Sequence, residues 1–371
     1  MTSRAGYLGY GLVFAAAFLI SAAVAGHFLP GSRVIAPHID PVMDGSPPII
    51  SSQTFPFEQW TVTITVPVNS SVYHGARLAD KSVVIYGNIS ENVWLADSYR
   101  SMMNDPSQAP LYDALAGAFR NVRAARNLTS DEYIELMALY VQSFRYESVP
   151  ENPPKFPVET VVERAGDCDD KSLLLAGLLT HEGYRVALLS FGPEAHMAVG
   201  IGSGTYLYKN TGYAFLETTN FSYVGVPTEV LESGLALRSD PVVIPIGNGT
   251  LLYGSGDETR YISDAGNVTG ARADAMEPHI RATANDLDAK QAAIASLEAR
   301  MAGFRDSGDM TQYNGRIPEH NDLVTAYNTE LSGYQQDYAL YQRYAEIHNY
   351  ILLNVFNRKG VYTFVRNNMT S

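Results

Sequence analysis

The block GDCDDK (residues 166–171) stands directly ahead of an apolar run, Leu173–Leu179, and holds the only cysteine of the 371-residue chain. We expect a helix that begins near Cys168 and ends near Gly183, because acidic side chains favour the first turn of a helix. A thiol in that turn would lie beside unpaired backbone N–H groups, which stabilise a thiolate. The block therefore predicts a reactive cysteine at a helix start.

Two later residues complete a catalytic pattern. His196 opens a stretch of alternating small and apolar residues, and Glu217 lies in a later stretch of the same kind, so we expect both on strands. His196 would share a strand face with Ala198 and Gly200, whose small side chains leave room over the thiol. A carboxylate on a neighbouring strand would hold the far nitrogen of the imidazole. Cys168, His196 and Glu217 thus predict a Cys-His-acid nucleophilic site.

The carboxylates beside the cysteine oppose its activation. Asp167, Asp169 and Asp170 favour the helix start, but close to the sulfur they would raise the pKa of the thiol. We therefore expect them to point away, or to bond backbone amides and Lys171.

The composition of the chain favours a globular protein and argues against several functional classes. The hydrophobic content of 46% suffices for a globular core, and the length suggests more than one domain. A net charge of −13 argues against a nucleic-acid binder, which needs a basic face. A single cysteine excludes an intramolecular disulfide and a zinc site built from several thiolates.

The N-terminus predicts export. Residues 5–29 contain no Asp, Glu, Lys or Arg, follow Arg4, and are numerous enough to span a membrane. Ala23-Val24-Ala25 also fits a signal-peptide cleavage site. We favour a transmembrane anchor over residues 1–29, with secretion after cleavage as the alternative; either way, the rest of the chain is extracytoplasmic. Seven glycosylation sequons agree with a glycoprotein: Asn69, Asn88, Asn127, Asn220, Asn248, Asn267 and Asn368.

The body of the chain mixes strands and helices. Residues 30–58, rich in Pro, Ser and Gly, are expected to form a linker, and residues 59–265 a folded domain. Thr129 with Glu132 is a capping box at a helix start. Four prolines within 146–157 predict an extended loop. The expected strands are 60–68, 82–86, 184–190, 196–201, 205–209 and 213–218, followed by a hairpin over 241–253 with its turn at 247–249.

The C-terminal part has a different pattern. Apolar and tyrosine residues repeat at seven-residue spacing within 271–356, and residues 303–318 separate two such runs. We predict an antiparallel, coiled-coil-like helical hairpin. Its tyrosine stripe either packs the two helices together or forms a docking arm for a protein partner. Residues 357–371 form a tail without a definite pattern.

The chain resembles the transglutaminase-like superfamily, in particular its archaeal exported or membrane-anchored members. The matching text is FPVETVVE (156–163), GDCDDKS (166–172), HMAVG (196–200) and FLETT (215–219), within residues 129–227. The resemblance implies an α+β, papain-like core in which the helix bearing the cysteine packs on an antiparallel sheet. It also implies Cys168 as nucleophile, His196 as general base and acid, and Glu217 as orienting acid, where many members have aspartate.

The implied reaction is acyl transfer from an amide through a thioester, as in a cysteine protease or a protein-glutamine acyltransferase, on cell-surface protein or peptide. The backbone N–H of Cys168 would supply one oxyanion donor, with Gln142 and Tyr146 as candidates for the second. No metal or organic cofactor is required. The alternatives are a catalytically silent transglutaminase-like module that binds a surface partner, and a structural component of the cell envelope.

Overall fold

The computed structural model describes residues 33–149, 152–228, 234 and 236–369. The predicted anchor or signal peptide lies outside these residues. In the described ranges, no helix combines the length and the apolar character that a membrane crossing needs. The chain divides into two compact units. One contains the residues up to Phe55 with Thr61–Phe221 and Pro227–Gly254, and the other contains Pro56–Trp60, Ser222–Val226 and the residues from Ser255 onward.

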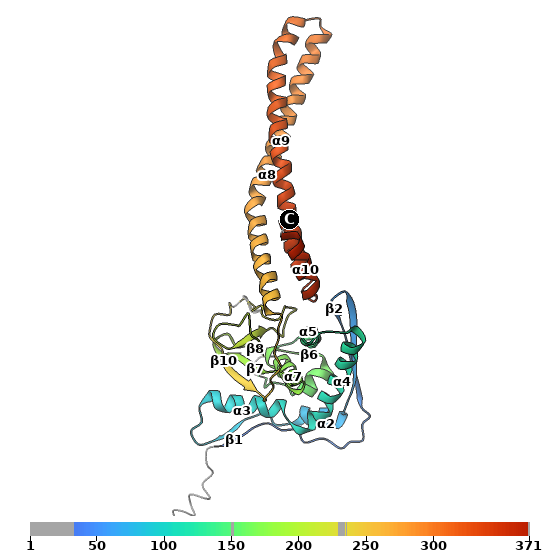
Figure 1. The fold of residues 1–371 in the computed structure, drawn as a ribbon, viewed down its shortest axis with the longest axis vertical. Coiled ribbons are helices and arrows are strands. Elements are labelled where there is room, and N and C mark those ends of the chain that lie inside the picture. The colour runs from blue at the N-terminus through green and yellow to red at the C-terminus, as the bar shows by residue number, and fades with distance from the viewer. Residues whose placement is uncertain (1–32, 150–151, 229–233, 235, 370–371) are drawn as a thin grey trace, which may run out of the picture. The chain divides into compact units, whose positions relative to one another are not determined.

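The first unit is built on a four-stranded antiparallel sheet with the strand order β10-β7-β8-β9. Its strands are β7 (Val186–Phe191), β8 (His196–Gly202), β9 (Tyr213–Leu216) and β10 (Val242–Ile246). Figure 1 labels β7, β8 and β10 of this sheet. Helix α7 (Cys168–His181) packs on β7, β8 and β10. Most of α7 is buried, because its apolar run also faces helices on the side away from the sheet. The predicted α+β class with an antiparallel sheet is confirmed.

Helices and small sheets surround this core. The helices are α2 (Ser70–Leu78), α3 (Glu91–Met103), α4 (Ala109–Arg126), α5 (Ser130–Gln142) and α6 (Pro157–Glu163), with 3-10 turns at Pro106–Gln108 and Gly192–Glu194. The described residues also form three strand pairs: β1 (Arg33–Ile35) with β4 (Val84–Tyr86), β2 (Ile49–Phe57) with β3 (Trp60–Val68), and β5 (Arg145–Tyr146) with β6 (Ala165–Gly166). The capping box of Thr129 and Glu132 is present at the start of α5, as predicted.

Three segments differ from expectation. Residues 205–209 form no strand, because Tyr206 and Lys209 adopt left-handed backbone angles (φ 53° and 44°) that interrupt an extended chain. Strands β1 and β2 both lie in the stretch 30–58 expected to be a linker, and Phe55 and Phe57 of β2 are buried. The prediction of a hairpin over 241–253 is wrong. The first half of this segment is β10, which pairs with β7, and Leu251 then forms a parallel bridge with Tyr184.

Gly249 explains the path after β10. A Cβ built there would lie 1.9 Å from the carbonyl oxygen of Tyr184, so only glycine permits this close approach. The amide of Arg185 then donates to the carbonyl of Leu251 at 2.9 Å. The segment therefore continues alongside the start of β7 instead of returning on β10.

The second unit contains the predicted helical hairpin. Helices α8 (Gly256–Asp306) and α9 (Met310–Leu353) are joined by a short turn, and α10 (Arg358–Met369) follows (Figure 1). Side-chain contacts between α8 and α9 run in opposite chain order, from Arg272–Tyr344 through Lys290–Glu330 to Glu298–His320. The helices are therefore antiparallel, and the seven-residue repeat on α8 faces inward at Ile280, Leu287 and Met301.

The hairpin is longer than its repeat indicates. Helix α8 begins before residue 271, because Ile262 and Ala265 already pack in a cluster with Ile351 and Val361. The turn occupies 307–309 instead of 303–318, and Pro318 lies inside α9, where it removes one N–H donor without ending the helix. Residues 358–369 of the expected tail form α10.

Candidate active site

Cys168 is the first residue of α7 and carries a free, buried thiol. The side chain of Asp167 caps the helix by accepting hydrogen bonds from the amides of Asp169 (3.1 Å) and Asp170 (3.2 Å). Asp170 reciprocates by accepting from the amide of Asp167 at 3.3 Å, which closes a capping box. The GDCDDK block thus forms the helix start that its composition predicts, and it fixes the backbone on both sides of the cysteine.

The sulfur lies between the aspartate that follows it and the start of β8. Its two hydrogen-bond acceptors are Asp169 Oδ1 at 3.5 Å and the carbonyl oxygen of Ala195 at 3.9 Å. Burial raises the pKa of the Cys168 thiol far above its ordinary value, and the charges of Asp169 and Asp167 raise it further. The backbone N–H of Met197 acts in the opposite direction without reversing the result. The resting group is therefore a thiol, not a thiolate.

The expectation for the three carboxylates holds in part. Asp167 and Asp170 bond backbone amides, and Asp170 also accepts from the amide of Lys155 at 2.6 Å. Asp169 does not point away: it accepts from the thiol and from the hydroxyl of Tyr99 at 3.0 Å. Asp169 therefore opposes ionisation of Cys168 more strongly than Asp167 does, because its carboxylate lies next to the sulfur.

His196 occupies the first position of β8, opposite Phe191 of β7. Ala195 before it has a left-handed backbone (φ 47°) that turns the chain into the strand. The imidazole is 6% exposed, and its ring centroid lies 6.2 Å from that of Phe191. Its Nε2 faces Glu217 Oε2 at 3.5 Å, which is an ion-pair distance without hydrogen-bond geometry. Nδ1 is the nitrogen that this pairing leaves for proton transfer.

Glu217 directly follows β9 and is 1% exposed. Its Oε1 accepts from the amides of Thr218 (2.8 Å) and Thr219 (2.9 Å) and from the Thr219 hydroxyl (2.8 Å), and its Oε2 accepts from the hydroxyl of Thr228. Burial alone would raise the pKa of this carboxyl. Its contact with His196 and these donors instead lower it to about 2. Glu217 is therefore a fixed carboxylate, able to stabilise an imidazolium.

The structure thus brings the three predicted residues to adjoining ends of α7, β8 and β9, but the surrounding space differs from expectation. The strand face that His196 shares with Ala198 is covered by Phe191, Tyr208 and Phe215. The small residues on that face therefore accommodate aromatic rings and do not open a space. Cys168 is 7% exposed, so access to the sulfur requires neighbouring side chains to move.

Lys171 and Ser172 of α7 join the three elements. The ammonium of Lys171, fully buried, donates to the carbonyls of Gln142 (3.3 Å), Phe144 (2.9 Å) and Thr219 (3.1 Å). It does not pair with the neighbouring aspartates, contrary to expectation, because it points into the core. The hydroxyl of Ser172 donates to the carbonyl oxygen of Met197 at 3.2 Å and lies 3.1 Å from the hydroxyl of Thr218.

These contacts reach the residues adjacent to His196 and Glu217, so the turn of α7 that carries Cys168 is joined to the main chain beside both of the other candidate catalytic groups. The signal in the sequence is a lysine and a serine immediately ahead of seven apolar or small residues, where a fully buried cation needs fixed acceptors.

Gln142, a candidate oxyanion donor, also belongs to this support. It is buried, and its Nε2 donates to the carbonyl oxygen of Glu217 at 2.8 Å. It therefore positions the main chain of the carboxylate. Tyr146, the other candidate, is the last residue of β5.

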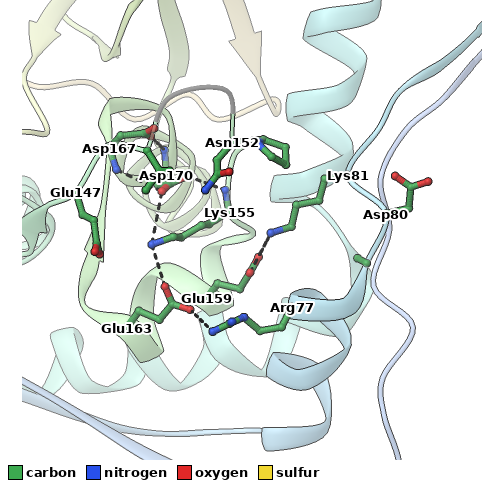
Figure 2. Close-up of a pocket in the computed structure, with 13 residues that line it drawn as sticks. Arg77, Asp80, Lys81, Glu147, Asn152, Lys155, Glu159, Glu163, Asp167 and Asp170 are labelled. Carbon is green, nitrogen blue, oxygen red and sulfur yellow. Dashed lines mark hydrogen bonds and ion pairs between the residues drawn. The ribbon is translucent and has the colours of Figure 1, made fainter.

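A charged cavity of about 490 Å³ adjoins the same helix start (Figure 2). Its wall includes Asp167 and Asp170 of α7 together with Lys155, whose ammonium lies 2.9 Å from Glu163. Lys81 and Arg77 are likewise paired with carboxylates of α6. Burial and the charge of Asp167 raise the pKa of Asp170 to about 7. The cavity thus borders the cap of Cys168, while the thiol itself faces β8.

Among the described residues, no group of His, Cys, Asp or Glu side chains is arranged to hold a metal ion. Comparison of the chain with protein-family models, curated proteins and solved structures finds no match. The chemistry of the site therefore has to be argued from its own residues.

Proposed function

We propose that this chain is an exported, cysteine-dependent acyl-transfer enzyme with a papain-like core of the transglutaminase-like superfamily, anchored by its N-terminal segment and acting on protein or peptide at the cell surface. The observation that carries the proposal is the pairing of His196 Nε2 with the ionised Glu217, beside a thiol on a helix N-terminus. In such an arrangement the imidazole can accept the proton of the thiol, and the carboxylate can stabilise the imidazolium that results.

Because the pKa of the Cys168 thiol is raised, the proposed mechanism begins from a neutral thiol. In place of a resting thiolate–imidazolium pair, proton transfer from Cys168 to Nδ1 of His196 accompanies attack of the sulfur on an amide carbonyl carbon. Glu217 stabilises the imidazolium that forms. The backbone N–H of Cys168, in the first turn of α7, is a donor for the oxyanion.

His196 returns the proton to the departing nitrogen, the C–N bond breaks, and a thioester with Cys168 and a free amine or ammonia result. Water or a primary amine then attacks the thioester, gives its proton to His196, and releases the acyl product. The proton finally returns to the sulfur.

Product analysis tests this function. The full-length chain, in detergent, is incubated with glutamine-containing peptides and a fluorescent primary amine, and mass spectrometry follows acyl adducts on Cys168, amine incorporation and peptide cleavage. A thioester adduct that disappears in Cys168→Ala supports the proposal. Peptides turned over equally by the wild-type chain and Cys168→Ala would overturn it.

The burial of the thiol and its raised pKa favour a second candidate, a catalytically silent module of the same superfamily that binds a surface partner. Such a module needs no proton transfer at its cysteine. The two candidates separate in the rate at which the thiol reacts with an electrophile, which depends on His196 only in the enzyme.

A further inference from the structure

An apolar patch lies on the small β1–β4 sheet and the adjoining first turn of α3. Its side chains are Ile35 (41% exposed), Val84 (45%), Ile85 (39%), Tyr86 (38%) and Val93 (50%). Consecutive strand residues point to opposite faces, so partial exposure of all three residues of β4 means that the described residues leave both faces of this strand partly open. Helix α3, whose first turn carries Val93, packs against β1 (Figure 1).

Covalent geometry ties this patch to the uncharged N-terminal segment. Only residues 30–32 separate Leu29, the last residue of that segment, from Arg33, the first residue of β1. Four extended steps cover at most about 14 Å. If residues 5–29 span a bilayer, β1 must therefore begin within or next to the headgroup layer.

The composition of the patch matches that layer. Aliphatic side chains bury favourably at the boundary of the acyl chains, and Tyr and Trp rings concentrate at the membrane–water interface. Tyr86 belongs to the patch, and the half-buried Trp94 follows Val93 on α3. The chain carries a net charge of −13, so a zwitterionic surface suits it better than an anionic one.

We propose that the apolar patch rests on the zwitterionic lipid surface from which the N-terminal segment emerges, so that the first unit is docked on the bilayer and not merely tethered to it. The proposal rests on the anchor put forward above and is independent of catalysis at Cys168. The bilayer is the surface proposed to cover the patch, because residues 30–32 are too few to hold β1 far from a membrane that the N-terminal segment spans.

The chain contains its own probe, because Trp94 directly follows Val93 of the patch and Trp60 is the one other tryptophan in the sequence. The full-length Trp60→Phe variant is reconstituted in phosphatidylcholine vesicles in which part of the lipid carries bromine on its acyl chains. Docking predicts that the brominated lipid quenches at least a third of the Trp94 fluorescence, with stronger quenching by bromine near the headgroup than by bromine near the chain end.

Two further variants separate docking from tethering. Ile85→Asp, in the Trp60→Phe background, should lose most of the quenching while the chain still floats with the vesicles. Asn92→Gln, a neutral change at an exposed residue in the first turn of α3, should keep it. Thiol labelling of Cys168 reports on the candidate active site in the same samples, so failure of docking and failure of the proposed function are distinguishable.

Three results would overturn the proposal. The first is vesicle-bound chain whose Trp94 is not quenched. The second is Trp94 emission that is shifted to the blue but indifferent to bromine, which would indicate that a second copy or the chain's own residues 5–29 cover the patch. The third is a chain that does not float with vesicles, which removes the anchor as well.

Discussion

Replacement of Asp169 by asparagine should make the thiol of Cys168 more reactive. Asp169 Oδ1 lies 3.5 Å from the sulfur, and its charge raises the pKa of the thiol. A unit charge near 4 Å disfavours a thiolate by about 1 kcal/mol in the dielectric of water and by about 4 kcal/mol at an effective dielectric constant of 20. Because about 1.4 kcal/mol corresponds to a factor of ten, removal of the charge should raise the thiolate population at least about fivefold.

The assay measures the second-order rate of labelling by a small neutral electrophile, such as iodoacetamide, from pH 6 to 9 on the folded chain. Asp97→Asn, a change at an exposed carboxylate on α3, is the matched control and should leave the rate unchanged. An Asp169→Asn rate equal to that of the wild-type chain at every pH would refute the assignment of Asp169 as the opposing charge. A slower rate would show that its carboxylate assists deprotonation.

Three further outcomes follow from the site. Glu217→Gln should remove stability that the wild-type chain holds above about pH 4.5 and loses as pH falls toward 2, since the folded pKa of Glu217 lies below its ordinary value; chemical denaturation at pH 3 and pH 7 measures this. Ser172→Ala should slow thiol labelling severalfold with little change in Tm, whereas Ser98→Ala, at another buried serine, should not slow it. Lys171→Met should lower the free energy of unfolding by about 3 kcal/mol, because buried carbonyls lose their donor, while the exposed Lys209→Met should cost far less.

The elements that depend on local chemistry could be predicted from sequence. The GDCDDK block forms its helix start because capping uses only neighbouring amides and carboxylates, and the same holds for Thr129 and Glu132. Strand β8 begins at His196 as expected from its alternation. The hairpin of α8 and α9 follows from a repeat that recurs over many turns.

What could not be predicted depends on contacts distant in the chain. The segment after β10 passes Tyr184 because Gly249 allows it, and no pattern within 241–253 reveals that neighbour. The buried position of Lys171 depends on carbonyls of Gln142 and Thr219, which lie 29 and 48 residues away. Likewise, the effect of Asp169 on the thiol is decided by its side-chain direction, which composition leaves open.

The central claim is that His196 takes the proton of Cys168. The direct measurement is the rate of thiol labelling against pH for the full-length wild-type chain and for His196→Ala, with Tm recorded for both. General-base participation predicts a rate at pH 7 that falls about a hundredfold in the variant while Tm changes little. Equal rates with the same pH dependence in the two proteins would contradict the claim and leave Cys168 a buried structural thiol.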